Sequence, residues 1–160
     1  MATSPDDTTK FLKVPPHSLE AESSVLGGLL LDDAAWDAIA GIIGPDDFYL
    51  GDHRSIFRCM QSLAEQDKPI DVITVSDALE EVSELQGLGG LSYISQLASN
   101  TPTASNIRAY AEIVQERATV RKLIAAANEI ADSGFNTQGR DSATLINEAE
   151  SKVFKIGDER

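Results

Sequence analysis

The side chains of this sequence best suited to metal binding are two histidines and one cysteine, His17, His53 and Cys59. A structural zinc site needs four ligands, usually in closely spaced pairs. These three residues are scattered, so the sequence predicts no metal site. His53 has no identifiable catalytic partner, and we expect a surface or capping histidine at the start of a helix. Cys59 lies among apolar residues, which indicates a buried small side chain.

Two pairs of neighbouring carboxylates, Asp32-Asp33 and Asp46-Asp47, could in principle perform acid–base chemistry. Adjacent carboxylates at element boundaries are far more often caps and turn formers. The chain has no G-x-x-x-x-G-K-[ST] phosphate loop and no Gly-Lys pair, and the glycine-rich run at 87–90 follows a polar helix end, which indicates a turn. We therefore expect no catalytic residue, no ATPase site and no cofactor in this chain.

The elements that carry these residues are expected to be helices, because apolar residues recur at helical spacing along most of the chain. Ser18 is placed to cap the first helix and Asp52 the third, and Thr74 with Asp77 resembles a capping box for the fourth. A short strand over 70–75 is the less favoured alternative. The helices are expected at about 19–31, 34–43, 53–66, 74–82, 91–97, 105–133 and 142–156.

The last two helices are predicted to form a hairpin, with Gly134 just past the end of the first and Asp141 or Ser142 starting the second. Each carries an apolar stripe that short loops cannot cover. The stripe is expected to pack against another subunit. The alternative, that the hairpin folds back on the first hundred residues, is equally compatible with the pattern. The candidate interface residues are Val120, Ile124, Ala127, Leu145, Ala149 and Val153.

Three basic residues on the long helix, Arg117, Arg121 and Lys122, have two interpretations. The simpler is a solvated helix face with internal ion pairs, and the closeness of Glu116 favours it. The other is a contact site for an acidic partner surface.

The length of 160 residues fits one domain, or one domain plus an appendage, and a composition with 42% hydrophobic and 6% aromatic residues is that of a folded protein. No apolar run approaches the ~20 residues that cross a bilayer. Residues 1–14 are polar and are expected to form a flexible tail rather than a signal peptide. A single cysteine excludes an intrachain disulfide, and the cytoplasm is the expected compartment.

The net charge of −13 argues against a chain that itself grips nucleic acid, because phosphate binding needs clustered Lys and Arg. The charge is unevenly distributed. Residues 1–100 hold 17 Asp and Glu against 5 Lys and Arg, a net of −12, whereas residues 101–160 hold 9 against 8. The two parts are therefore expected to face different partners.

Six blocks of sequence, in order, resemble the N-terminal domain of the bacterial replicative DNA helicases, the DnaB family. The resemblance covers roughly residues 15–157. Its blocks are Pro-Pro-His-Ser-Leu-Glu-Ala-Glu at 15–22 with Val-Leu-Gly-Gly at 25–28; 46–49 with His53, Ile56 and Phe57; 69–74; Gly89-Gly90 with Tyr93; 100–106; and 110–114 with Glu116-Arg117.

This resemblance implies an all-α fold, a compact globule of about five short helices at 15–100 followed by a long-helix hairpin at 101–157 that pairs between protomers. It implies a collar, a trimer of dimers, in a hexameric ATP-driven 5′→3′ helicase. Primase and a helicase loader would be partners. DNA, ATP and Mg would be bound by a motor domain outside this sequence, to which 158–160 would begin the linker.

Two other functions remain as alternatives. The first is a stand-alone acidic adaptor that binds a protein partner and has no motor. A P-loop encoded downstream of Arg160 would exclude it. The second is a small hydrolase that uses scattered carboxylates.

Overall fold

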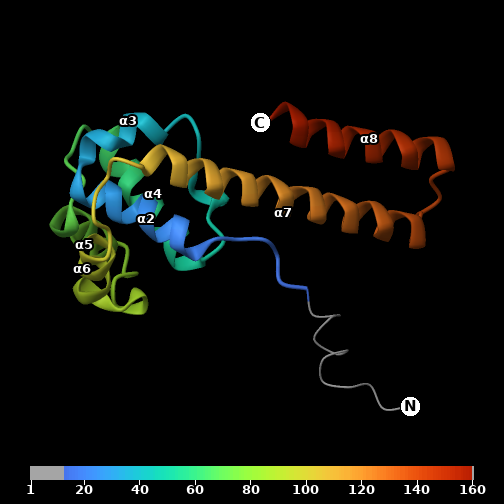
Figure 1. Ribbon diagram of the computed structural model, residues 1–160. Coiled ribbons are helices and arrows are strands. Elements are labelled where there is room, and N and C mark those ends of the chain that lie inside the picture. Colours follow the sequence, from blue (N-terminus) through green and yellow to red (C-terminus); the bar gives the residue numbers. More distant parts are fainter. Residues whose placement is uncertain (1–12, 160) are drawn as a thin grey trace, which may run out of the picture.

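The computed structural model describes residues 13–159, and within them the chain is entirely helical, as predicted. The predicted tail at 1–14 lies almost wholly outside the described residues. Figure 1 shows a globular head, from which a pair of long helices projects. The elements are α2 (Leu19–Leu31), η1 (Asp33–Ala35), α3 (Trp36–Ile39), η2 (Pro45–Asp47), α4 (Gly51–Glu65), α5 (Val72–Glu81), η3 (Gln86–Leu88), α6 (Gly90–Ser99), α7 (Ile107–Phe135) and α8 (Ser142–Asp158).

Helix α2 is the centre of the head and begins and ends where the sequence predicts. Ser18 is its N-cap, and the Ser18 hydroxyl accepts a hydrogen bond from the amide of Ala21 at 3.2 Å. Most of its residues are buried because α6 and α7 pack against it. Gly27 permits this packing: a Cβ there would lie 2.4 Å from the carbonyl oxygen of Leu97 in α6.

The second predicted helix, 34–43, is shorter than expected. The Asp32 carboxylate accepts from the amide of Ala34 and starts η1, and α3 then ends at Ile39. Gly41 weakens the helix beyond Ile39, where the chain continues as a turn: the amides of Ile42 and Ile43 both donate to the carbonyl oxygen of Ile39. Gln115 of α7 donates to the carbonyl oxygen of Ile42 at 3.0 Å, which satisfies an acceptor that the end of the helix leaves free.

Two predicted caps are wrong. Asp52 lies inside the first turn of α4, whose N-cap is Leu50. Helix α5 is capped by Asp71 and not by Thr74: the Asp71 carboxylate accepts from the amide of Thr74 at 2.8 Å, and the Thr74 hydroxyl accepts from the amide of Asp71 at 2.9 Å. This reciprocal pair satisfies two amides that would otherwise lack partners, so the helix starts two residues before Thr74. No strand forms at 70–75.

Helix α7 is bound to the head only along its first half, where Ile107, Ala111, Val114 and Ala118 are buried. Gly134 lies inside this helix, and the prediction that it follows the end is wrong. The left-handed conformation is adopted instead by Gln138 and Gly139 in the loop. Asp141 caps α8 as predicted, with its carboxylate accepting from the amide of Thr144 at 2.9 Å.

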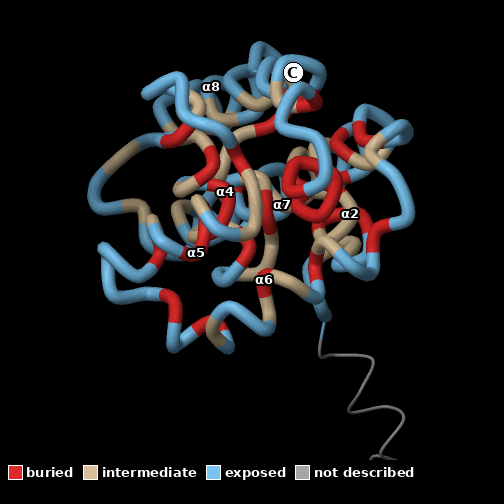
Figure 2. The backbone as a smooth tube through the Cα atoms, turned by 90° about the vertical axis from the view of Figure 1, so that its left-hand side faces the viewer, coloured by how far each residue is buried: buried red, intermediate tan, exposed pale blue. Residues whose placement is uncertain are grey.

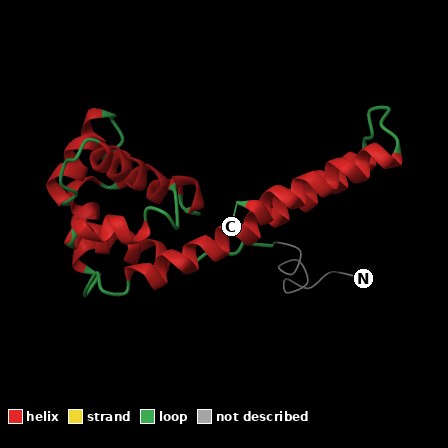
Figure 3. Ribbon diagram, turned by 90° about the horizontal axis from the view of Figure 1, so that it is seen from above, coloured by secondary structure: helices red, strands yellow, loops and turns green. Residues whose placement is uncertain are grey.

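The hairpin is therefore an open structure attached to a packed head. Seen from above, the hairpin of α7 and α8 extends well beyond the head (Figure 3). In the view along its axis, buried backbone gathers around α2, α4 and α7, whereas α8 is almost entirely exposed or half-buried (Figure 2).

Candidate functional site

Helix α8 folds back along α7, and only its C-terminal end, at Ile156 and Glu159, comes near the head. Exposed ion pairs cross the hairpin. Lys152 Nζ lies 3.6 Å from Glu129 Oε2, and Arg140 pairs with Glu148. Pairs so open to solvent add ~0–1 kcal/mol each. Apolar contact between α7 and α8 must therefore supply most of the hairpin's own stability.

The hairpin carries large apolar side chains that reach into solvent. Phe135 is 94% exposed, Phe154 71% and Ile146 57%, and no residue of α8 is buried. Leu123, Ile124 and Val153 are also exposed. Large apolar side chains exposed together on one structural unit are a mark of interaction sites in soluble proteins. We call these six residues, Leu123, Ile124, Phe135, Ile146, Val153 and Phe154, the hairpin patch.

The six predicted interface residues divide into two groups. Leu145 and Ala149 are half-buried and line a cavity of about 210 Å³ between α7 and α8, so they face the other helix of the same hairpin. Val120 is also half-buried. Ile124, Ala127 and Val153 are exposed. The structure thus leaves three of the six free to meet another molecule.

Sequence reasoning missed Phe135, Ile146 and Phe154, the three most exposed members of the hairpin patch. Phe135 continues the spacing of Ile124, Ala127 and Ala131, but ending the helix at Gly134 removed it from the stripe. By helical spacing, Ile146 lies about a quarter turn from the stripe of Leu145 and Ala149, and Phe154 lies on the opposite face of α8. A helix with apolar residues on two faces is expected to pack against neighbours on both. The sequence of α8 therefore does contain the signal for a second contact surface.

Arg121 binds within its own chain. Its guanidinium donates to the carbonyl oxygens of Pro16 at 2.8 Å and Asp47 at 2.6 Å, and lies 5.6 Å from the centre of the Tyr49 ring. Burial lowers the pKa of Arg121 from its ordinary value, against the favourable field of Glu22. Arg121 therefore fastens α7 to two loops of the head.

The other two basic candidates are less constrained. Lys122 Nζ lies 3.5 Å from Glu159 Oε2 and 3.9 Å from Asp47 Oδ1, and Arg117 is half-buried without an ion pair among residues 13–159. The ion pairs of Lys122 reach η2 and the residue after α8, so they are not the pairs within one helix face that the sequence predicts. Arg117 is the member of the set whose charge remains available to a partner.

His53 is buried, at 2% exposure, so the expectation of a surface or capping residue is wrong. Its Nδ1 lies 2.8 Å from Glu22 Oε1, and its Nε2 lies 3.2 Å from the Tyr93 hydroxyl. Glu22 also accepts from the amide of Tyr49 at 2.8 Å. Burial by itself would raise the pKa of Glu22, but the hydrogen bonds from His53, Tyr49 and Leu50 outweigh it and hold the pKa below its ordinary value.

This Glu22–His53–Tyr93 network joins α2, α4 and α6; Tyr93 lines a cavity of about 380 Å³ in the described part of the chain, to which Glu22 and His53 do not contribute. A buried carboxylate whose hydrogen bonds are satisfied within the fold is a structural element of the core. Sequence reasoning could not find it, because 31 residues separate Glu22 from His53.

Between residues 13 and 159, no cluster of three or more His, Cys, Asp or Glu side chains is arranged to hold a metal ion. None of the helices described here combines the length and the apolar character needed to cross a bilayer.

Comparison with known proteins identifies the relatives of this chain. The family described as "DnaB-like helicase N terminal domain" matches residues 14–116, which are the head and the first third of α7. The replicative DNA helicase DnaB of Pasteurella multocida is 48% identical over 147 residues, which cover 92% of this chain and 32% of the relative. The chain thus spans about a third of the length of the curated relatives it matches.

Solved structures extend the similarity to the hairpin. The crystal structure of the N-terminal domain of DnaB helicase from Mycobacterium tuberculosis superposes with a TM-score of 0.85 at 34% identity, covering 89% of this chain and 99% of that one. A DnaB-like replicative helicase, described with its interactions with primase, superposes with a TM-score of 0.73 at 25% identity, covering 87% and 31%.

Proposed function

The chain belongs to the DnaB family of replicative DNA helicases, as their N-terminal domain, and from this premise we propose that it is the non-catalytic, self-associating collar of such a helicase. The whole protein would be a hexameric, ATP-dependent 5′→3′ helicase in the cytoplasm. ATP and Mg would bind in a motor domain that the relatives' additional length accommodates. This chain would contribute assembly and docking, and no cofactor site.

The hairpin patch is the observation that carries this proposal. Its six side chains lie on α7 and α8, and each of them remains exposed in the part of the chain that the structure describes, residues 13–159. Burying one such side chain fully contributes about 1.5–3 kcal/mol. Two hairpins that bury their patches against each other would therefore gain enough to form the dimers from which a trimer of dimers is built.

Primase and a helicase loader are the partners we propose for the collar. The support for primase is the similarity to a replicative helicase described with its interactions with primase. DNA would be bound by the motor domain, since this chain has a net charge of −13.

Self-association can be tested by sedimentation of the 160-residue chain over a concentration range. Ile124→Glu and Phe154→Glu each place a charge in the hairpin patch. An unpaired charge in an apolar interface costs about 3 kcal/mol or more, which weakens dimerisation more than about 100-fold. Both variants should sediment as monomers at concentrations where the unchanged chain is a dimer.

Ile73→Glu is the matched control, because Ile73 is 70% exposed on α5 of the head, far from the patch in Figure 1. It should dimerise like the unchanged chain. A chain that stays monomeric at every concentration, or a loss of dimer equal in all three variants, would contradict the proposal. Melting curves recorded beside the sedimentation separate loss of assembly from loss of folding.

A further inference from the structure

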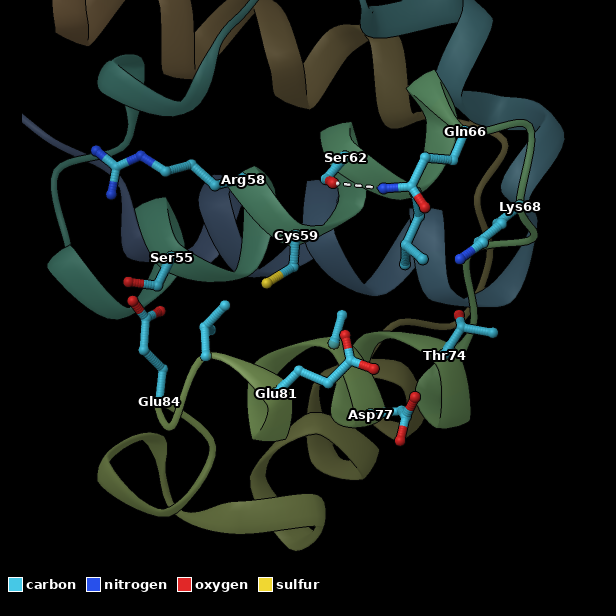
Figure 4. Close-up of a pocket in the computed structure, with 13 residues that line it drawn as sticks. Ser55, Arg58, Cys59, Ser62, Gln66, Lys68, Thr74, Asp77, Glu81 and Glu84 are labelled. Carbon is cyan, nitrogen blue, oxygen red and sulfur yellow. Dashed lines mark hydrogen bonds between the residues drawn. The ribbon is translucent and has the colours of Figure 1, made fainter.

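A cleft of about 400 Å³ lies between α4 and α5, on the side of the head away from the hairpin. Its floor is apolar and consists of Cys59 and Leu63 from α4 with Ala78 and Val82 from the α5 side. Val82 is 57% exposed, and the sulfur of Cys59 points across the cleft toward α5 (Figure 4). The head thus has apolar surface that its own helices leave open.

The charged groups along this cleft are mainly negative. Asp77, Glu81 and Glu84 line the α5 side, and none of them forms an ion pair among residues 13–159. On the α4 side, Arg58 lies 3.5 Å from Asp46. Burial and the nearby charge of Glu84 raise the pKa of the Cys59 thiol, so the negative field reaches the floor.

The two cations that line the cleft, Arg58 and Lys68, leave an excess of one negative charge among its five charged side chains. Ser62 accepts a hydrogen bond from the Gln66 side chain at 3.1 Å, which engages both residues with each other. Lys68 stands at one end of the cleft (Figure 4). The open centre therefore presents an apolar strip bordered by carboxylates, a surface complementary to a cation with an apolar body.

The dimensions of the cleft favour a helical occupant. Its α4 wall runs from Ser55 to Gln66, a length of about 16 Å or three helical turns. Asp77 and Glu81 are one turn apart on the opposite wall, which matches the spacing of two cations one turn apart on a helix lying beside them. Apolar side chains at i and i+4 of such a helix would cover Cys59 and Val82.

We propose that the α4–α5 cleft binds a basic amphipathic helix of a partner protein, whose apolar stripe covers Cys59, Ala78 and Val82 and whose Lys or Arg side chains pair with Asp77, Glu81 and Glu84. This site lies on the head and is independent of the hairpin patch, so it does not rest on the collar function.

The probe for the test is a fluorescent peptide of about 16 residues, with Leu at i, i+3, i+4 and i+7 positions and Lys elsewhere. A second peptide of the same composition, scrambled so that the stripe is lost, controls for general attraction to an acidic protein. Fluorescence anisotropy in about 0.15 M salt gives the dissociation constants, because weak long-range attraction is screened there. We expect the amphipathic peptide to bind at least about tenfold more tightly than the scrambled one.

Two kinds of variant locate the bound peptide. Ala78→Trp fills the floor, and Val82→Lys puts a cation at an exposed edge where folding is not at risk; each should weaken binding about tenfold. The pair Asp77→Asn with Glu81→Gln should do the same. The pair Asp37→Asn with Glu150→Gln removes equal charge elsewhere and should change binding less than about twofold.

The reactivity of the Cys59 thiol provides an independent measurement of binding, because Cys59 is the only cysteine of the chain. Its rate of reaction with a thiol reagent should fall at least about fivefold when the peptide is bound. Equal binding by all variants, or an unchanged Cys59 rate, would overturn the proposal. A dimer of the unliganded chain that Ala78→Trp abolishes would also overturn it, since the occupant would then be a second copy of this chain.

Discussion

Replacing Gly27 by alanine tests the account of how the head is packed. An added Cβ would lie 2.0 Å from the Thr101 hydroxyl and 2.4 Å from the carbonyl oxygen of Leu97, both far inside van der Waals contact. The Thr101 hydroxyl donates to that same carbonyl at 3.0 Å. Because one of the two atoms is backbone, α2 and α6 must separate to admit the methyl group.

The expected cost follows from three contributions. Overpacking a core costs about 1–3 kcal/mol. Loss of the buried Thr101 hydrogen bond adds about 1 kcal/mol. Alanine is the better helix former by about 1 kcal/mol, which offsets part of the loss. Gly27→Ala should therefore lower the free energy of unfolding by about 1–3 kcal/mol.

The neighbouring residue provides a matched control in the same helix. The nearest atom to a Cβ at Gly28 would be the end of the Ile107 side chain, at 3.1 Å, while the backbone Cα of Ala104 would lie at an ordinary contact distance of 3.6 Å. Gly28→Ala should therefore change the free energy of unfolding by less than about 1 kcal/mol. Urea unfolding followed by circular dichroism measures both. A Gly27→Ala chain as stable as Gly28→Ala would refute the close packing of α2 against α6.

Four further outcomes are expected. The fold lowers the pKa of Glu22, so its carboxylate stabilises the folded chain at pH values above its unfolded pKa of about 4.5. This contribution is lost as the pH falls through the folded pKa. Glu22→Gln should therefore reduce the free energy of unfolding at pH 7 and make that free energy depend less on pH in the acid range. Asp71→Ala should lower the free energy of unfolding in urea by about 1 kcal/mol, whereas Asp77→Ala should leave it nearly unchanged. The reverse order would favour Thr74 with Asp77 as the cap of α5. Arg121→Lys should lower the free energy of unfolding by about 1 kcal/mol, because an ammonium cannot bind both carbonyl oxygens and the Tyr49 ring. Arg117→Lys is the control and should leave the free energy of unfolding unchanged. Single-stranded DNA should bind no more tightly than about 1 µM at physiological salt, and a tighter complex with a steep salt dependence would show that the basic residues were misjudged.

The start of a helix was predictable from the sequence where capping residues and prolines next to it determine that start. Pro15, Pro16 and Ser18 determine where α2 begins, and Asp141 determines where α8 begins. The cap of α5 was also local, but Asp71-x-x-Thr74 was overlooked in favour of Thr74 and Asp77. The acceptor role of the Ile42 carbonyl oxygen, just beyond α3, was not predictable from local pattern, because its donor Gln115 is 73 residues away.

The same distinction explains which parts of the site were predictable. Helical spacing identified Ile124 and Val153 as apolar positions, but spacing cannot say which neighbour covers them. Leu145 and Ala149 proved to face α7, a result that depends on how the two helices rotate against each other. The partner of His53 was beyond reach for the same reason, since contacts between distant segments are set by packing and not by local pattern.

The loop at 47–50 connects these observations, because it is held from both sides. Glu22 of α2 accepts from the amide of Tyr49, while Arg121 of α7 donates to the carbonyl oxygen of Asp47. Arg54 donates to the carbonyl oxygens of residues 48 and 49, at 3.0 and 2.8 Å. The base of the hairpin is thus joined to the centre of the head through charge-assisted hydrogen bonds, which are stronger and more directional than neutral ones. If hairpins pair between protomers, this joint fixes the direction in which each head points, and the α4–α5 cleft with it.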